Sequence, residues 1–308
     1  MLELRKEPAP EPGAGQLLVE VEAAGVNYRD IYEREGSYGA PPPFVAGVEG
    51  AGTVAAAGEG VTEFIVGDRV AWISAQGSYA EQVVVEEARA VPVPDGTSSE
   101  LAAAVLLQGM TAHYLATSTY PVQPGDDVLV HAVGGGVGLL LTQVVKIRGG
   151  RVIGTTSSED KEQRARKVGA DEVIGYDGFA ERVRELTRGE GAAVVYDGVG
   201  QATFAGSLAS LRPRGHMVLF GAASGRVPPF DPMRLEEHGS LFLTRPSSRH
   251  YTARREELLQ RAAQVFGWTA EEKLRVHIGG RYPLEDARRA HEDLEARRTS
   301  GKLLLLPG

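Results

Sequence analysis

The stretch from 131 to 138 carries four glycines whose spacing suits the binding of a pyrophosphate. Before it, the apolar run Val128–Val130 predicts a buried strand, and after it leucines and valines at helical spacing predict a helix up to Ile147. A strand, a glycine turn and a helix in this order aim backbone N–H groups and the positive end of the helix at an anion. The sequence therefore predicts a dinucleotide site, with an ordinary glycine turn as the alternative.

The glycine spacing departs from the commonest dinucleotide fingerprint. G-x-G-x-x-G fails because Leu139 stands where the third glycine would be. Gly134 and Gly136 keep the turn free of side chains. The spacing that fits places small residues three apart, at Ala132, Gly135 and Gly138.

The segment after the next strand, 151–154, indicates which dinucleotide would bind. In NAD-preferring sites an Asp or Glu near the end of this strand accepts the ribose hydroxyls. Here the hydroxyls of Thr155–Ser158 and the ammonium of Lys161 follow instead, and these donors suit a 2′-phosphate. Glu159 or Asp160 turned inward would favour NADH, and the same hydroxyls also suit the cap of the following helix. We expect NADPH as the cofactor.

Three further apolar segments predict more strands of one sheet. They span 172–174, 192–197 and 216–220, and the last two break into small residues where they end. Strands that alternate with helical segments predict an open, doubly wound parallel sheet, which binds ligands at the carboxyl ends of its strands.

The flanking segments predict a second architecture. Residues 16–23 largely alternate apolar and polar positions, as a half-exposed strand does, and 23–54 places many glycines among β-branched residues, which is typical of a strongly bent small barrel. Towards the C-terminus we expect a helix over 253–266, a strand near 274–278 and a helix over 284–297.

Length and composition restrict the class of protein. A chain of 308 residues should hold two domains, and 42% hydrophobic with 24% charged residues is ordinary for a globular protein. No apolar run reaches membrane-spanning length, and a net charge of −8 without a basic block argues against nucleic acid or anionic membranes as partners. The absence of cysteine excludes disulfides, thiolate metal sites and a cysteine nucleophile. A cytoplasmic location is the default expectation.

Several motifs together resemble those of the zeta-crystallin type of quinone oxidoreductase, in the medium-chain dehydrogenase/reductase superfamily. The resemblance covers nearly the whole chain. It implies an α/β protein with a GroES-like bent β-barrel catalytic domain, over 1–108 and 247–308, and a Rossmann nucleotide-binding domain over 109–246. The motifs are Gly25–Asp30, Gly47–Gly52, Val66–Val70, Gln108–Tyr114, His131–Gly138, Val195–Gly200 and Ser240–Pro246.

The resemblance also implies roles for individual residues. Asn27 and Tyr32 would face the nicotinamide and the substrate, with Tyr38 near the pocket mouth. Lys302 would reach the site from the returning C-terminus. The other cofactor-binding residues would be Thr111, Gly134, Gly135, Gly136, Val137, Ser157, Lys161, Tyr176, Phe220, Gly221, Ser224, Phe242 and Leu243.

The resemblance sharpens an expected absence of zinc. Zinc-dependent alcohol dehydrogenases of this superfamily carry a cysteine where Asn27 stands and a histidine where Val48 stands, beside Glu49. With those two ligand types missing, a three-ligand catalytic zinc site cannot form there. We therefore expect metal-free hydride transfer, with Glu49 as a buried structural residue. His113 and His131 are expected to have structural rather than acid–base roles.

Three function classes follow. The first is an NADPH:quinone oxidoreductase, and the second is an NADPH-dependent reductase of the C=C bond of an enone or enoyl thioester. The third, favoured least, is a non-catalytic crystallin-like or RNA-binding protein. The resemblance further implies a homodimer, and an additional N-terminal strand before the position of Leu2. Either the start of this sequence is misassigned or an edge of the first sheet is unprotected, and in the second case we expect lower stability of the first domain.

Overall fold

The structure is a computed structural model that describes residues 2–36 and 41–308, and the predicted site residue Tyr38 lies outside these ranges. The chain divides into two compact units. Unit 1 comprises residues 1–110, 253–271 and 276–308, and unit 2 comprises 111–252 and 272–275. Helix α2 (Ser99–Tyr114) begins in unit 1 and ends in unit 2.

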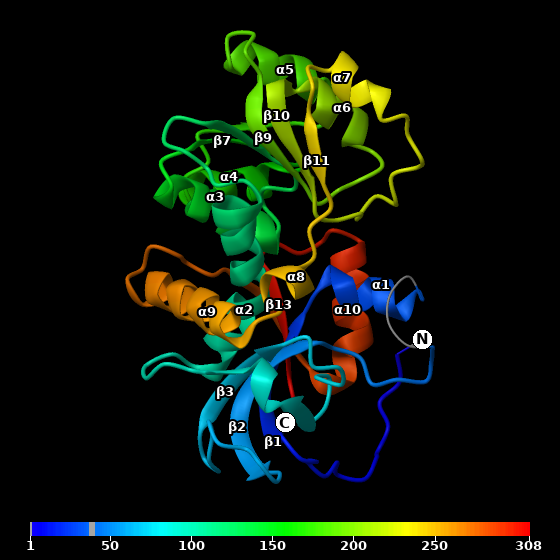
Figure 1. Cartoon of the computed structure of the whole chain (residues 1–308). Helices are drawn as coiled ribbons and strands as arrows, with labels where there is room; N and C mark the ends of the chain where they lie inside the picture. The colour runs from blue at the N-terminus through cyan, green and yellow to red at the C-terminus, as the bar shows by residue number, and fades with distance from the viewer. Residues whose placement is uncertain (1, 37–40) are drawn as a thin grey trace. The chain divides into compact units, whose positions relative to one another are not determined.

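A seven-stranded sheet forms the framework of unit 1 (Figure 1, blue and red strands). The strand order is β12-β13-β1-β2-β3-β5, with β4 also paired to β1; β12 and β13 are parallel and the other pairs antiparallel. The strands are β1 (Gln16–Val26), β2 (Glu49–Ala57), β3 (Arg69–Ile73), β4 (Gln82–Glu86), β5 (Ala90–Pro92), β12 (Ile278–Pro283) and β13 (Lys302–Leu306).

Strand β1 organises this sheet because it pairs with three others. Its first half, Gln16–Glu20, pairs with β4, and its last residues, Ala24–Val26, pair with β13. Two register shifts against β2 bend the ribbon between these halves. Glycine is required at the crossing, because a methyl group at Gly52 would lie 1.9 Å from the carbonyl oxygen of Glu20. The strongly bent sheet expected from the dense glycines is confirmed.

Helices cover the strands of unit 1. Helix α1 (Tyr28–Arg34) follows β1 directly, and α10 (Ala287–Glu295) packs near it. The predicted helix over 253–266 is present as α9 (Arg255–Ala270). The remaining short helices of this unit are the 3-10 turns Glu87–Arg89 and Leu284–Asp286.

Unit 2 is built on a six-stranded, wholly parallel sheet with the order β11-β10-β9-β6-β7-β8. Its first strand in sequence, β6, lies in the middle, and the chain leaves it first towards β7 and later returns to β9. This reversal is the switch point at which open α/β sheets bind ligands. The strands are β6 (Asp127–Val130), β7 (Arg151–Thr155), β8 (Glu172–Ile174), β9 (Ala192–Asp197), β10 (Leu211–Leu219) and β11 (Phe242–Thr244).

Helices cover both faces of this sheet (Figure 1). Helices α3 and α4 lie on one face and α5 and α6 on the other (Figure 1). The predicted doubly wound fold is therefore confirmed. The helices are α3 (Gly136–Ile147), α4 (Glu159–Lys167), α5 (Phe179–Leu186), α6 (Phe204–Ala209), α7 (Met233–Glu237), α8 (Ser248–Tyr251) and the π-helical turn Leu115–Thr119.

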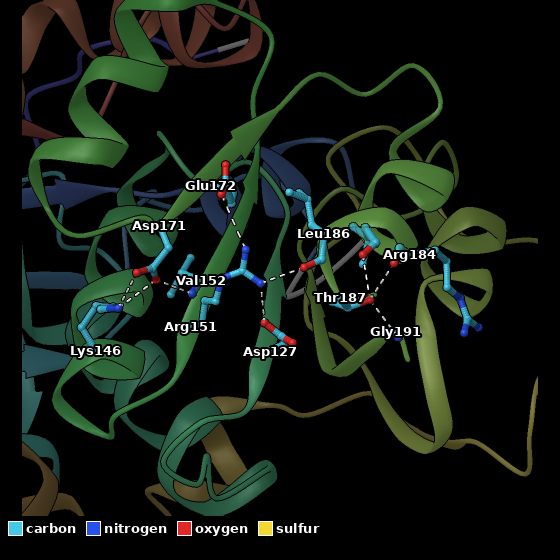
Figure 2. Close-up of polar contacts among 11 residues, drawn as sticks. Asp127, Lys146, Arg151, Val152, Asp171, Glu172, Arg184, Leu186, Thr187 and Gly191 are labelled. Atoms are coloured by element: carbon cyan, nitrogen blue, oxygen red, sulfur yellow. Dashed lines mark hydrogen bonds and ion pairs between the residues drawn. The ribbon is translucent and has the colours of Figure 1, made fainter. Parts of the chain in front are cut away.

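Charged side chains tie the amino-terminal edge of this sheet together (Figure 2). Arg151 at the start of β7 donates to Asp127 of β6 at 2.9 Å and to the carbonyl of Leu186 at 3.1 Å, and its guanidinium lies 3.6 Å from Glu172 of β8. Ligands of such sheets bind at the opposite, carboxyl edge. We assign these contacts to holding adjacent strands in register.

One predicted strand is wrong. The strand expected near 274–278 begins only at Ile278, as β12. The backbone of Arg275 is instead hydrogen-bonded to the side chain of Gln143. The N–H of Arg275 donates to Gln143 Oε1 at 2.7 Å, and Gln143 Nε2 donates to the carbonyl of Arg275 at 3.0 Å. The apolar pattern alone could not reveal that a distant amide occupies this backbone.

Within residues 2–36 and 41–308, the helices are all too short or too polar to cross a bilayer.

Candidate functional site

The turn between β6 and α3 has the geometry expected of an anion site. The N–H of Gly135 donates to the carbonyl of Ala132 at 2.8 Å, and Leu139 donates back to Gly135 at 2.9 Å, so the helix starts directly after the turn. A methyl group at Gly138 would lie 2.4 Å from the carbonyl oxygen of Ala132. Only glycine lets the helix approach the turn this closely, and the first N–H groups of an α-helix lack helical partners, so the start of α3 is suited to binding an anion.

The residue between β6 and this turn is a buried histidine. His131 is 1% exposed; its Nδ1 lies 2.8 Å from Thr155 Oγ1 and its Nε2 lies 2.9 Å from Ser207 Oγ. Ser207 donates to Asp197 at 3.0 Å and therefore accepts from the imidazole. Burial lowers the pKa of His131 to about 4, although Asp197 acts in the opposite direction. The imidazole is neutral at pH 7 and links β6, β7 and α6.

Residues predicted to hold the 2′-phosphate gather beside the turn. A methyl group at Gly134 would lie 2.6 Å from Lys161 Cβ, so the stem of this lysine packs on the glycine turn. The N–H of Ala132 donates to the hydroxyl of Tyr176 at 3.1 Å. Ser157 is exposed at the start of α4. The fold thus brings Gly134, Lys161 and Tyr176 to one end of the turn.

The acidic residues before Lys161 bear on the choice of cofactor. Asp160 accepts from Arg164, one helical turn further along α4, at 3.0 Å, and Glu159 is exposed. A carboxylate engaged along the helix is not turned towards the end of β7. This contact favours the predicted 2′-phosphate site over an inward carboxylate that would bind ribose hydroxyls.

Loops after β9 and β10 form the next part of the carboxyl edge. They touch through backbone, because a methyl group at Gly221 would lie 2.3 Å from the carbonyl oxygen of Gly198. The ring of Phe220 packs on Gly198 as well, and Ser224 donates to the carbonyl of Val199 at 2.8 Å. Phe220, Gly221 and Ser224 therefore lie together, half-buried, at the edge where the sequence placed them.

Phe242 lies elsewhere. It is the first residue of β11, pairs in register with His216, and stacks on the ring of His216 with centroids 4.6 Å apart. Because His216 lies within β10, before the strand ends at Leu219, the structure does not bring Phe242 to the carboxyl edge. Leu243 follows it in the strand, and Thr111 lies half-buried on α2.

The interior of unit 1 holds a buried charged cluster that includes Asn27 and Lys302. Lys302 and Glu49 form an ion pair in which both side chains are 0% exposed. The Lys302 ammonium also donates to Asn27 Oδ1 at 2.8 Å, and Asn27 Nδ2 donates to Glu49 Oε2 at 2.8 Å. The cluster packs on the bare backbone of Gly25, where a methyl group would lie 2.3 Å from Glu49 Oε2.

Helix α2 joins this cluster through two neighbouring residues. The N–H of Leu107 donates to Glu49 Oε1 at 2.6 Å, and Gln108 Nε2 donates to Asn27 Oδ1 at 3.4 Å. Gln108 Oε1 is buried and has no hydrogen-bond partner among residues 2–36 and 41–308. The sequence did not identify Gln108 as an individual site residue. The signal present was a single amide side chain directly after a run of apolar residues at helical spacing.

A second buried network holds α1, the helix that begins just after Asn27. Asp30 Oδ2 accepts the N–H of Asn27 at 2.8 Å and the hydroxyl of Tyr79 at 2.9 Å, and Tyr79 in turn lies 3.0 Å from His291 Nε2. Burial raises the pKa of Asp30 to about 7. The predicted site residue Tyr32 lies half-buried on this helix.

Comparisons with known proteins agree over the whole chain. The family model described as "Zinc-binding dehydrogenase" matches residues 136–264, and the model described as "Alcohol dehydrogenase GroES-like domain" matches residues 13–95. A quinone oxidoreductase of Pseudomonas aeruginosa is 44% identical over 311 residues, covering 100% of this chain and 96% of that protein. A 2-haloacrylate reductase of a Burkholderia species is 39% identical, covering 96% and 92%. The crystal structure of Escherichia coli quinone oxidoreductase complexed with NADPH superposes with a TM-score of 0.97 at 39% identity, covering 99% and 95%.

The zinc in the family's description does not fit the residues of this chain. Val48 is a buried hydrocarbon side chain, and Glu49 and the amide of Asn27 are both bonded to Lys302. Among the residues that the structure describes, no group of three or more His, Cys, Asp or Glu side chains could hold a metal ion.

The glycine turn, in contrast, fits a dinucleotide, because the absence of a side chain at Gly138 lets the start of α3 pack directly on the backbone of Ala132 and Val133, as a pyrophosphate-binding turn requires. From these matches and from the two folds, the chain belongs to the zinc-binding dehydrogenase family with a GroES-like domain, in the medium-chain dehydrogenase/reductase superfamily.

Proposed function

We propose that this protein is a zinc-independent NADPH:quinone oxidoreductase. The observation that carries the proposal is the turn from β6 to α3, with the stem of Lys161 packed on Gly134 and Asp160 engaged by Arg164. Phosphate-binding backbone and a lysine beside it suit NADPH. The relatives named quinone oxidoreductase, and the NADPH complex of one of them, support the same reading.

The cofactor-binding residues are proposed from each unit. In unit 2, the glycine turn would hold the pyrophosphate, and the side chains beside α4 and β8 would hold the 2′-phosphate. In unit 1, Asn27, Tyr32 and Lys302 would serve the nicotinamide end, Lys302 acting through Asn27. The unit 2 set is Thr111, Gly134, Gly135, Gly136, Val137, Ser157, Lys161, Tyr176, Phe220, Gly221, Ser224 and Leu243, without Phe242, which lies away from the carboxyl edge.

NADPH supplies a hydride when bound, and the protein's own groups would orient and stabilise the quinone that accepts it. A phenol such as Tyr32 can donate a hydrogen bond to the oxygen that becomes negative as the quinone is reduced. The reduced quinone is a stabilised anion, so the reaction does not require a dedicated general acid. In keeping with this, His131 is buried and neutral, and the Lys302 ammonium is held in an ion pair with Glu49.

A second candidate is an NADPH-dependent reductase of activated C=C bonds. The relative named 2-haloacrylate reductase favours it, since a haloacrylate carries such a bond. A non-catalytic crystallin-like or RNA-binding role is least favoured because the chain carries a net charge of −8. We further propose a homodimer located in the cytoplasm.

The test measures oxidation of NADPH and NADH in parallel with 1,4-benzoquinone, a larger ortho-quinone and 2-chloroacrylate. Quinone turnover with NADPH and little with NADH supports the proposal. NADPH binding with turnover of 2-chloroacrylate alone moves the C=C reductase to first place. A chain that binds neither cofactor contradicts both enzymatic candidates.

A further inference from the structure

A chain of polar contacts runs through unit 1 from Glu49 to Gln108, and its charges fix the direction of every amide along it. The Lys302 ammonium is held between the Glu49 carboxylate and Asn27 Oδ1. The amide of Asn27 therefore has one allowed orientation. Turned over, it would set its oxygen against the carboxylate and its NH₂ group against the ammonium, and both contacts would be repulsive.

The orientation of Asn27 fixes that of Gln108. Asn27 Oδ1 faces Gln108 Nε2 at 3.4 Å. A reversed Gln108 amide would bring two carbonyl oxygens together at this distance. The Nε2 group of Gln108 must therefore point at Asn27, and its Oε1 must point the other way.

Gln108 Oε1 is the last atom in this series of polar contacts, and it accepts no hydrogen bond from the described residues. The atom is buried, and within residues 2–36 and 41–308 nothing donates a hydrogen bond to it. A buried acceptor that loses water without gaining a partner costs free energy, so native proteins satisfy nearly all such atoms. Because the ion pair holds this acceptor in place, a bound molecule that carries a donor would complete the chain.

We propose that Gln108 Oε1 accepts a hydrogen bond from the carboxamide NH₂ of the nicotinamide of NADPH. The chemistry of the two ligands favours the cofactor, because a quinone carries only acceptors and the carboxamide carries two N–H donors. Glu49 and Lys302 are then positioning residues, which fix the orientation of Gln108 through the amide of Asn27. The inference rests on the proposed function, since it names a contact of the same cofactor. The hydroxyl of the hydroquinone product is the other possible donor.

The test measures the binding of two ligands to the wild type and to a variant of the full chain. Equilibrium titration gives the Kd of NADPH and of its reduced 3-acetylpyridine analogue, in which a methyl ketone replaces the carboxamide. Gln108→Met should raise the Kd of NADPH about tenfold, equivalent to about 1.4 kcal/mol, and leave the Kd of the analogue within about twofold. A third titration, with the hydroquinone product as inhibitor, reports on the other donor.

Gln143→Met is the matched control. Gln143 is also a buried glutamine, but both ends of its amide are bonded to Arg275. This control should lower the melting temperature, because it removes both hydrogen bonds to Arg275, but its ratio of the two Kd values should equal that of the wild type. A melting curve of Gln108→Met establishes that the variant is folded at the titration temperature.

Three outcomes would overturn the inference. Equal weakening of NADPH and the analogue would mean that Gln108 acts by packing. Unchanged binding of both would mean that it contacts neither. Weaker inhibition by the hydroquinone, with NADPH binding unchanged, would assign the acceptor to the product. Each of these leaves the proposed function intact, whereas a wild type that does not bind NADPH would remove the proposed function itself.

Discussion

Lys302 and Glu49 face each other inside unit 1 with no solvent exposure of either side chain. Their charges balance, and Asn27 and Leu107 complete the hydrogen bonding of the carboxylate. A buried pair of this kind stabilises little relative to apolar residues, but removing one partner leaves an uncompensated charge. The pair therefore matters more for orienting Asn27 than for net stability.

Lys302→Met should lower the free energy of unfolding by about 3–5 kcal/mol, because Glu49 is left buried and charged. The double variant Lys302→Met/Glu49→Gln should recover most of that loss, because no charge then remains buried. Urea unfolding of the wild type and both variants measures the difference. Equal stability of the single and double variants would show that the charges do not interact as described.

Gly138→Ala should weaken NADPH binding at least about tenfold and destabilise the protein by about 1–3 kcal/mol. Its methyl group would meet the carbonyl oxygen of Ala132 at 2.4 Å and push α3 away from the turn. Titration with NADPH and thermal melting measure the two effects. Gly267→Ala is the control, because an added methyl on α9 meets no atom within 4 Å and should stabilise the helix by about 0.5–1 kcal/mol. Unchanged NADPH affinity in Gly138→Ala would argue against the turn as the pyrophosphate site.

Lys161→Ala should raise the KM for NADPH about tenfold or more and leave the KM for NADH unchanged. The expected reason is the loss of a charge-assisted hydrogen bond to the 2′-phosphate, worth about 1.5–3 kcal/mol. Steady-state kinetics with both cofactors provide the measurement. Lys167→Ala, an exposed lysine at the end of the same helix, serves as the control. A matching loss with NADH would place Lys161 outside the phosphate site.

His291→Gln should flatten the fall in stability on acidification. Burial lowers the pKa of His291 to about 4, against 6.5 for the ordinary side chain, with Arg34 as a further cause. The folded state thus binds fewer protons than the unfolded state, so this contribution is full above pH 6.5 and is lost as the pH falls from 6.5 to 4. Between pH 7.5 and pH 5 the wild type should lose about 2 kcal/mol more than the variant.

Urea unfolding at the two pH values measures that difference. Asp30, in the same network, has its pKa raised to about 7 and changes stability in the opposite direction over this range. Only the comparison between wild type and variant therefore isolates His291. Parallel pH profiles would mean that His291 is not neutral in the folded protein.

The sequence by itself determined several elements of unit 2, although the strand predicted at 216–220 spans Leu211–Leu219 as β10. Apolar runs at 192–197 and 172–174 became β9 and β8 with the same bounds, and the glycines at 134–138 form the turn between β6 and α3. These features were predictable because they depend on local spacing: a buried parallel strand is a short apolar run, and a tight approach of backbone to helix requires glycine. The strand near 274–278 failed because its backbone is bonded to Gln143, 132 positions earlier.

Only the tertiary structure decided what surrounds Asn27. The resemblance to a family named Asn27 and Lys302, which are 275 positions apart, but not the ion pair with Glu49 or the acceptor of Gln108 that has no donor. Antiparallel pairing of β1 with β13 sets Val26 opposite Leu303 and so brings Lys302 to the end of β1. Spacing along a chain reports which residues share a face or a turn, whereas contacts between distant strands follow from how the sheet is assembled.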